Sequence, residues 1–300
     1  MKKVIITGAG GFVGSALTQK FINNGVAVIA VSMAFNDKIF PKSPLITRIE
    51  SKIDVSETLK SIIPQDEYDA FYHLAWMGIN GSDKANPLVQ LDNIKVAMNC
   101  ALVAKQLGCK KFLCSGTLAE QSIKSLSSLE KTSGGMIYGV AKYCTHMILE
   151  TYSKNIGLDF VWMQFSNIYG PGNKTGNLVS YTISNLLEGK EATFGPALQL
   201  YDFIYIDDLV EAVYRLGLYK TKQNFYFIGS GETRILKDYL IEIGRKCGKL
   251  DLIKIGARQD DGIVYTIDMF DISGLIMDIG NYNLTDFSKG IDLTLDSYSK

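Results

Sequence analysis

Three side chains in the middle of the sequence can together transfer a proton. Tyr138 and Lys142 are four residues apart at the start of a predicted helix that runs to about residue 155, so both project from one face. A phenol has a pKa of about 10, and an ammonium group one turn away favours its ionised form. Thr117 follows a predicted strand, and its hydroxyl can bond the same substrate oxygen. This set suits hydride exchange at a carbinol carbon with a redox cofactor.

An isolated tyrosine–lysine pair at this spacing is weak evidence, because many amphipathic helices carry one. The segment 7–14, TGAGGFVG, strengthens the case for an active site. This segment follows a short apolar strand and leads into a predicted helix over 12–22. This is the setting of a dinucleotide fingerprint. Gly8 allows a positive φ, Gly11 the approach of a pyrophosphate, and Gly14 close packing of helix on strand. The alternative is a tight turn that binds nothing.

The end of the second predicted strand, residues 26–31, bears on the choice of cofactor. An acidic residue there bonds the ribose 2′-hydroxyl and repels a 2′-phosphate. This position falls at Ser32 or Met33, and neither is acidic. The sequence therefore favours NADP(H), with Lys38 or Lys42 as candidate phosphate partners, and leaves NAD(H) open.

Composition argues against several other classes of function. The chain has 300 residues, 47% of them hydrophobic, which suffices for a large core. Lys+Arg and Asp+Glu are both 31, so no basic field favours nucleic acid. The start is too short for a signal peptide, and no apolar run approaches the roughly 18–20 residues that cross a bilayer, so we expect a cytoplasmic protein without a membrane partner. Five cysteines without metal spacing and two histidines predict reduced thiols and no metal site.

The order of predicted elements indicates an α/β fold with a Rossmann-like, doubly wound parallel sheet. Strands and helices alternate up to about residue 170 and less regularly beyond it. We therefore assign residues 1–170 to an NAD(P)-binding domain, which elements from about 200–230 rejoin. Residues 171–300 form mainly a smaller C-terminal α/β lobe that binds substrate. Residues 122–135, rich in Ser, Lys and Gly, are predicted to form a mobile loop.

These motifs resemble those of the extended short-chain dehydrogenase/reductases, the NAD(P)-dependent nucleotide-sugar epimerase/dehydratase/reductase group. The resemblance covers essentially the whole chain. Besides the glycine segment, Thr117, Tyr138 and Lys142, it rests on Asp54-Val55, His73-Leu74-Ala75, Asn93, NIYGPG at 167–172, DFIYIDD at 202–208, Arg258 with Asp261, Asp271-Ile272-Ser273 and Gly290-Ile291.

The resemblance implies a role for each matching position. Thr117 matches the catalytic Ser/Thr, Tyr138 the acid/base, and Lys142 the lysine that holds the nicotinamide ribose. The cofactor positions are Gly8, Gly11, Phe12, Val13, Asp54, Val55, Leu74, Ala75, Asn93, Tyr138 and Lys142, to which Ser32 is added from its place at the strand end. The positions for a nucleotide-diphosphate sugar are Thr117, Asn167, Asn177, Leu178 and Arg258. A homodimer through helices 88–107 and 139–155 is also implied.

Departures from the family pattern narrow the reaction. Gln164 and Tyr201 stand where the family usually has arginines, so one diphosphate contact is absent. Leu118-Ala119 follow Thr117 where the 4,6-dehydratases have Asp-Glu, so we do not expect dehydration. Glu120 is either an extra carboxylate near the site or, as we prefer, a solvated or helix-capping residue.

Three functions share this chemistry. The first is a 4-ketoreductase of a nucleotide-linked deoxysugar, in which Tyr138 gives the proton; the non-acidic strand end favours it. The second is a 4-epimerase with tightly bound NAD, which would use the same residues. The third is a non-catalytic, cofactor-sensing protein, which is disfavoured because Tyr138 and Lys142 are both present.

Overall fold

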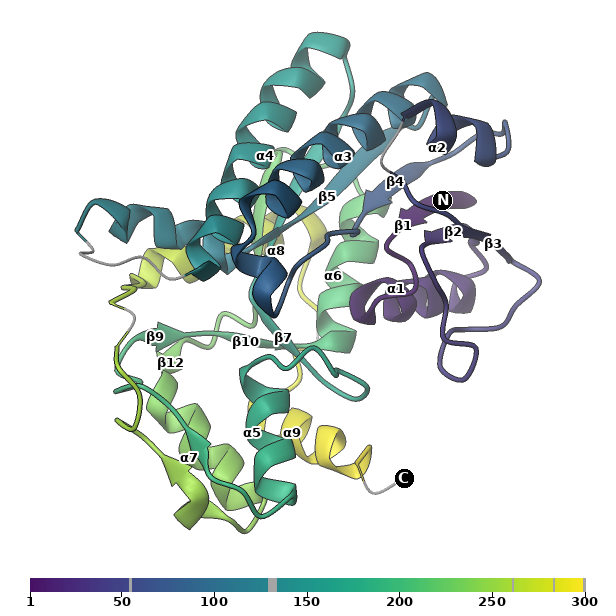
Figure 1. Ribbon diagram of the computed structural model, residues 1–300. Helices are drawn as coiled ribbons and strands as arrows, with labels where there is room; N and C mark the ends of the chain where they lie inside the picture. Colours follow the sequence, from purple (N-terminus) through teal and green to yellow (C-terminus); the bar gives the residue numbers. More distant parts are fainter. Residues whose placement is uncertain (54–55, 129–133, 261, 283, 299–300) are drawn as a thin grey trace.

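The computed structural model of the protein describes residues 1–53, 56–128, 134–260, 262–282 and 284–298. Figure 1 shows a larger part built around a parallel sheet, with a smaller lobe below it that contains α5, α7 and α9.

A seven-stranded sheet in the order β11-β6-β5-β4-β1-β2-β3 forms the larger part, and every neighbouring pair is parallel. Most of its strands are short apolar runs buried on both faces, as is typical of parallel sheets. The strands are β1 Lys3–Thr7, β2 Ala27–Ser32, β3 Ile46–Glu50, β4 Ala70–His73, β5 Lys111–Thr117, β6 Phe160–Phe165 and β11 Phe225–Ile228. The chain runs outward from β1 in both directions, so the strand order reverses between β1 and β4. The predicted doubly wound α/β fold is confirmed.

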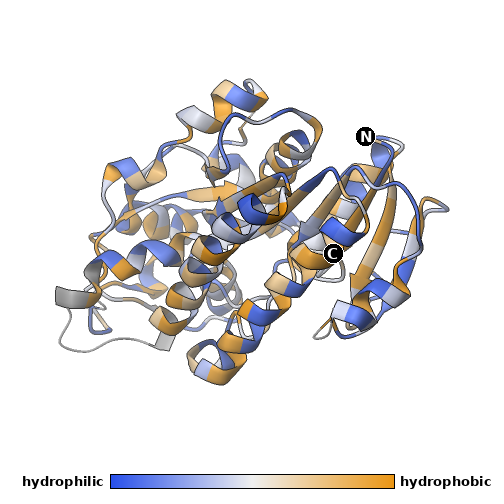
Figure 2. Ribbon diagram, turned by 90° about the horizontal axis from the view of Figure 1, so that it is seen from above, coloured by the Kyte–Doolittle hydropathy of each residue, from blue (hydrophilic) through white to orange (hydrophobic). Residues whose placement is uncertain are grey.

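Helices cover both faces of the sheet (Figure 2). On one face, α1 (Phe12–Asn23) and α6 (Ile206–Leu218) pack over a core that contains Val4 and Ile6. Ile5, which points the other way along the strand, belongs to the second core. The helices that contribute to this second core are α2 (Ser56–Ile62), α3 (Pro87–Gln106) and α4 (Gly134–Ile156).

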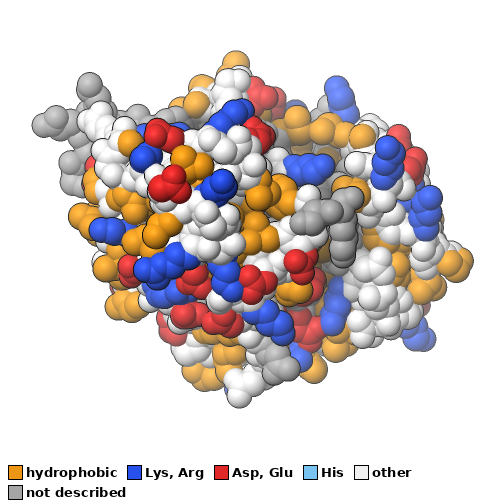
Figure 3. Space-filling view, turned by 90° about the horizontal axis from the view of Figure 1, so that it is seen from below, with side chains coloured by type: hydrophobic (Ala, Val, Ile, Leu, Met, Phe, Trp, Pro, Cys, Tyr) orange, Lys and Arg blue, Asp and Glu red, His pale blue; other side chains and the backbone are white. Residues whose placement is uncertain are grey.

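Within the described residues, the lobe contains three two-stranded sheets and the α-helices α5 (Leu178–Leu187), α7 (Leu236–Lys246) and α9 (Phe287–Asp296). Its strands are β7 Asn167–Tyr169, β8 Ala192–Thr193, β9 Leu200–Tyr201, β10 Phe203–Tyr205, β12 Arg234–Ile235 and β13 Ile253–Lys254. The helix α8 (Ser273–Ile279) packs instead against β11 and α6 of the larger part. The pairs are β10 with β7, β12 with β9, and β13 with β8. On the face seen from below in Figure 3, Lys and Arg side chains are interspersed with Asp and Glu.

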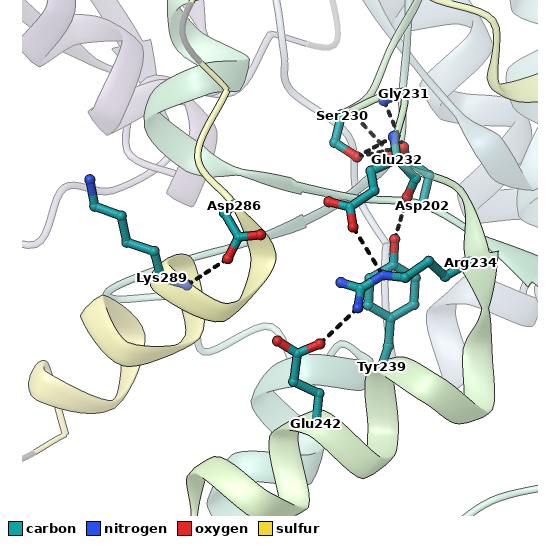
Figure 4. Close-up of polar contacts among 9 residues, drawn as sticks. All are labelled: Asp202, Ser230, Gly231, Glu232, Arg234, Tyr239, Glu242, Asp286 and Lys289. Atoms are coloured by element: carbon teal, nitrogen blue, oxygen red, sulfur yellow. Dashed lines mark hydrogen bonds and ion pairs between the residues drawn. The ribbon is translucent and has the colours of Figure 1, made fainter.

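Buried polar groups fasten the lobe to the end of the sheet (Figure 4). The Asp202 carboxylate accepts hydrogen bonds from the Ser230 N–H at 3.1 Å, the Ser230 hydroxyl at 2.8 Å and the Gly231 N–H at 3.0 Å. Nearby, the Arg234 guanidinium lies 2.8 Å from the Glu242 carboxylate and 4.1 Å from the Tyr239 ring centroid. Because Ser230 and Gly231 lie in the turn after β11, these contacts join Asp202, between β9 and β10 of the lobe, to the end of the sheet.

Two segments differ from the predicted elements. A 3₁₀ helix, η2, spans Leu118–Ser128, and α4 begins four residues before Tyr138, where the sequence favoured a loop over 122–135. Residues 129–133 of that loop lie outside the described residues. The segment 202–208 does not form one strand: β9 ends at Tyr201, β10 spans Phe203–Tyr205 and α6 begins at Ile206. Among the helices of the described ranges, none has the length and apolar character to cross a membrane.

Candidate active site

The glycine turn between β1 and α1 is packed so closely that three of its glycines leave no space for a side chain. Gly8 has a φ of +76°, and a Cβ there would lie 2.6 Å from the Ala75 nitrogen. A Cβ on Gly14 would lie 2.2 Å from the Gly8 oxygen. Gly10, to which the sequence assigned no role, is equally confined, since a Cβ would lie 2.3 Å from the Ala34 oxygen. The turn therefore brings α1 and the segment after β4 against the end of β1.

The start of α1 fits the pyrophosphate of a dinucleotide. The helix begins after Gly11, which offers no capping side chain, and its first turn contains no acidic residue. Phe12 and Val13 therefore open a helix whose first N–H groups lack intrahelical partners, at the positive end of the helix dipole. Ser32 ends β2 beside this turn. These residues can hold a nicotinamide dinucleotide at the point where the strand order reverses.

Of the other predicted cofactor positions, two lie at the glycine turn and two lie outside the described residues. Leu74 and Ala75 follow β4 and lie against Gly8, so the structure brings them to the glycine turn. Asp54 and Val55 lie outside the described residues.

Asn93 lies on α3, buried beneath the loop that follows β4. Its side chain accepts a hydrogen bond from the Met77 N–H at 2.8 Å and donates one to the Met77 carbonyl at 2.8 Å. Gln90, one turn earlier, accepts a bond from Trp76 Nε1 at 2.8 Å and donates one to the Gly78 carbonyl at 3.0 Å. The two amides therefore shape the loop over 76–78, and the Asn93 amide is used by the protein itself.

A capping box places Thr117 at the carboxyl end of β5. The Thr117 N–H donates to Glu120 Oε1 at 2.6 Å, and the Ala119 N–H donates to Thr117 Oγ1 at 3.3 Å. A Cβ on Gly139 would lie 2.4 Å from the Ala119 oxygen, so α4 packs directly on η2. The Thr117 side chain faces the Tyr138 phenol and favours its ionised form. Helix and strand thus bring together the two residues that the sequence predicted to share a substrate oxygen.

Lys142 is buried and its ammonium group already has partners. Nζ donates to the Ser115 carbonyl at 2.7 Å and lies 3.7 Å from the centroid of the Trp76 ring. Burial lowers the pKa of Lys142 to about 8. The Trp76 ring meets the Tyr138 ring edge-on at 6.2 Å, and Lys84 Nζ lies 5.3 Å from the Tyr138 centroid.

The electrostatics of the phenol differ from the sequence-based expectation. We expected Lys142 to lower the pKa of Tyr138, but burial raises that pKa instead, and the hydrogen bond from Thr117 opposes the rise only in part. The Glu120 carboxylate raises it further. The physical reason is burial, which disfavours the charged phenolate, while the Lys142 ammonium is directed at the Ser115 carbonyl and the Trp76 ring. Without a ligand, the protein holds Tyr138 as a neutral proton donor.

The predicted substrate residues occupy the junction of the sheet and the lobe. Asn167 begins β7 and donates to the Asp202 carbonyl at 3.2 Å. Asn177 caps α5, with Oδ1 accepting the Ser180 N–H at 3.0 Å, and Leu178 is the first residue of that helix. The structure thus places these three residues on β7 and at the start of α5, the next helix along the chain.

Arg258 is joined to the same helix from the far side of the lobe. Its Nη2 donates to the Tyr181 hydroxyl at 2.7 Å and its Nε to Thr193 Oγ1 at 2.8 Å. Tyr181 lies on α5, one turn after Leu178. Arg258 therefore presents an exposed cation held in place by two hydroxyls.

Sequence reasoning missed or misjudged three residues of the site. Trp76 and Lys84 were given no role, although a tryptophan directly after a strand end is a signal that a ring covers the edge of the sheet. Glu120 was expected to be solvated or capping. The capping interpretation agrees with the bond to Thr117, but the side chain is buried, not solvated. Within the described residues, no group of three or more His, Cys, Asp or Glu side chains is placed to hold a metal ion.

Comparison with known proteins agrees with this geometry. The model of the NAD dependent epimerase/dehydratase family matches residues 4–229. The chain is 26% identical over 255 residues to UDP-glucuronate 4-epimerase of Thermodesulfobacterium geofontis, which covers 80% of this chain and 78% of that protein. It is 24% identical over 302 residues to dTDP-4-dehydro-6-deoxyglucose reductase of Escherichia coli, covering 92% and 89%.

Solved structures show the same fold. The UDP-glucose 4-epimerase of Thermotoga maritima with UDP-glucose superposes with a TM-score of 0.84 at 22% identity, covering 99% of this chain and 98% of that one. The UDP-glucose 4-epimerase of Thermus thermophilus with NAD gives a TM-score of 0.76 at 18% identity, covering 99% of each chain.

Proposed function

Because the chain belongs to the NAD-dependent epimerase/dehydratase family, we propose that it is an NAD(P)-dependent oxidoreductase that transfers hydride at C4 of a nucleotide-activated sugar. The observation that carries the proposal is the Tyr138 phenol. It faces the Thr117 side chain at the carboxyl edge of the parallel sheet, and Lys142 lies one turn further along α4. Relatives with this chemistry in their names include a 4-epimerase and a 4-dehydro-sugar reductase.

In the reductive direction, Tyr138 gives the proton and Thr117 positions the oxygen that receives it. A bound nicotinamide supplies the hydride that reaches the carbonyl carbon. The phenol O–H bond breaks as the new O–H bond forms on the sugar, and the phenolate recovers a proton from solvent. Burial raises the pKa of Tyr138, which suits it to start as the acid. Leu118 and Ala119 carry no acid or base, so the site is not set up to eliminate water.

We favour a 4-ketoreductase of a nucleotide-linked deoxysugar that uses NADPH. Ser32, at the end of β2 beside the glycine turn, leaves room for a 2′-phosphate without a repelling carboxylate. The similarity to the reductase of Escherichia coli extends over 92% of the chain. The test is NADPH oxidation with nucleotide-linked 4-keto-6-deoxysugars as substrates.

The second candidate is a 4-epimerase with tightly bound NAD. It is favoured by the 4-epimerases among the relatives and by a neighbouring structure whose title names NAD. Release of NAD from the purified, denatured protein, together with interconversion of 4-hydroxy sugars without added cofactor, identifies this function. NADPH-dependent turnover of a keto sugar identifies the first.

We further propose that Asn167, Asn177, Leu178 and Arg258 hold the nucleotide diphosphate. The exposed Arg258 guanidinium supplies a fixed positive charge, which is what a diphosphate requires. Gln164 is buried and bonded to Glu120, and the Tyr201 ring packs at a tilt against Phe203, so neither replaces the missing arginines.

Replacement of Tyr138 by Phe tests the proposed function directly. We expect Tyr138→Phe to lower kcat by about 10²–10⁴-fold, because the phenol proton is lost while the ring remains. Cofactor affinity should change by less than about twofold, since the glycine turn and Lys142 are untouched. Tyr143→Phe, an exposed tyrosine on the same helix, is the matched control and should keep full activity. Full activity of Tyr138→Phe rejects the acid/base role.

A further inference from the structure

Glu120 is a carboxylate buried beside the reacting groups, and the proposed reaction does not use it. Only 3% of its surface is exposed. Oε1 accepts the Thr117 N–H at 2.6 Å, while Oε2 accepts Trp162 Nε1 at 3.1 Å and Gln164 Nε2 at 3.2 Å. A Cβ on Gly116 would lie 2.6 Å from Oε1, so the backbone of β5 is shaped around this group. A buried carboxylate is costly unless charge and hydrogen bonds compensate it, so its presence calls for a reason.

The charged and titratable groups that face Glu120 come from α4 and β5. Lys142 and Tyr138 face it from α4, and Cys114 from β5. Burial raises the pKa of the Cys114 thiol to about 12, so this thiol is neutral around pH 8. On the other side of Lys142, burial lowers the pKa of His73 to about 3, so the imidazole is neutral too. Glu120 therefore supplies the negative charge that the Lys142 ammonium experiences among these groups.

We propose that Glu120 is a positioning residue of the active site, which sets the Thr117 hydroxyl toward Tyr138 and keeps the Lys142 side chain positively charged. The proposal rests on the proposed function. Thr117 Oγ1 accepts the Ala119 N–H, so its own proton is free to point to the phenol. Glu120 fixes the backbone from which that hydroxyl projects. It acts through Thr117 and Lys142 and donates no proton to substrate.

The sign of the electrostatic effect follows from the surroundings of Lys142. Burial lowers the pKa of Lys142 to about 8, and negative charge at Cys114 and Glu120 opposes this. Because Cys114 is neutral in this range, removal of the Glu120 charge lowers the pKa of Lys142 further. The ammonium then loses its proton at a lower pH. Activity and cofactor affinity, which both depend on that charge, should decline at a lower pH than in the wild type.

The test compares Glu120→Gln with Glu67→Gln, a change at an exposed glutamate in the segment that precedes β4. Both kcat/KM and the Kd of NADP⁺ or NAD⁺ are measured from about pH 6 to 9, a range that brackets the Lys142 pKa of about 8. With Glu120→Gln, we expect kcat/KM and cofactor affinity to decline at a pH that is lower than in the wild type by at least about half a unit. We also expect kcat to fall about tenfold at neutral pH. Glu67→Gln should match the wild type. A folded Glu120→Gln protein with wild-type profiles overturns the proposal.

A second variant keeps the proposal testable if Glu120→Gln does not fold. Gln164→Leu preserves the carboxylate but removes one hydrogen bond to its ionised form, so the pKa of Glu120 rises above about 7. The alkaline limb should move in the same direction by a smaller amount, and an unmoved limb contradicts the proposal. The cofactor-binding profile does not depend on turnover. Failure of the proposed reaction, seen as an active Tyr138→Phe, is therefore distinguished from failure at Glu120.

Discussion

The indole ring of Trp76 lies over the ammonium group that the resemblance assigns to the nicotinamide ribose. Lys142 Nζ is 3.7 Å from the ring centroid, and Gln90 holds the indole nitrogen at 2.8 Å. A ribose that reaches Lys142 must therefore share the ammonium with this ring or displace it. Binding of the cofactor at Lys142 should therefore change the surroundings of the Trp76 ring.

We expect cofactor binding to change the emission of Trp76. Titration of the protein with NADPH or NAD⁺ should quench tryptophan fluorescence in a saturable way, because the ring lies beside the ammonium that the cofactor contacts. Trp76→Phe, which keeps only the buried Trp162, should lose most of the response. An undiminished quench in Trp76→Phe, with binding verified by calorimetry, would place the cofactor elsewhere.

At the level of elements, the glycine turn sets how closely α1 approaches β1. We expect Gly14→Ala to lower the free energy of unfolding by about 1–3 kcal/mol, because its Cβ would lie 2.2 Å from the Gly8 oxygen and α1 must shift. Cofactor affinity should fall with it, since the N–H groups of α1 move. Chemical denaturation and cofactor titration measure both effects. Gly195→Ala, whose nearest neighbour would be 3.4 Å away, is the control and should change little.

Element positions were largely predictable where local periodicity is strong. The helices expected over 12–22 and 88–107 are found at Phe12–Asn23 and Pro87–Gln106. The segment after Thr117 was not predicted, because its apolar spacing is weak and its structure depends on a single long-range acceptor. Glu120 is held by Trp162 and Gln164 of β6, more than 40 residues away in sequence. The four-residue spacing correctly placed Lys142 on the same helix face as Tyr138. It could not show that the Lys142 ammonium group contacts the Ser115 carbonyl and the Trp76 ring.

At the scale of the whole molecule, the predicted membership of the extended short-chain dehydrogenase/reductases is confirmed. The family match over residues 4–229 shows it, and the UDP-glucose 4-epimerase of Thermotoga maritima has the same fold. The roles assigned to single site residues and the domain boundary near residue 170 stay predictions. So does the homodimer, for which α3 and α4 offer exposed apolar side chains, among them Leu91 and Met147.

We expect Met147→Glu to turn a dimer into a monomer. The side chain is 37% exposed on α4, and a charge at the centre of an apolar helix contact costs more than the contact provides. Light scattering after size exclusion gives the mass directly. Leu198→Glu, a change at a 70% exposed leucine of the lobe, should leave the mass unaltered. A wild-type mass equal to one chain removes the proposed dimer.

The helix α3 has a consequence for communication within such an assembly. Its residue Leu91 faces solvent, whereas Gln90 and Asn93, immediately before and two positions after it, grip the loop that carries Trp76. A rotation of this helix by a neighbouring subunit would be transmitted through two amide side chains to the indole over Lys142. In the proposed dimer, the subunit contact and the entrance to the proposed active site would therefore be linked through this one helix.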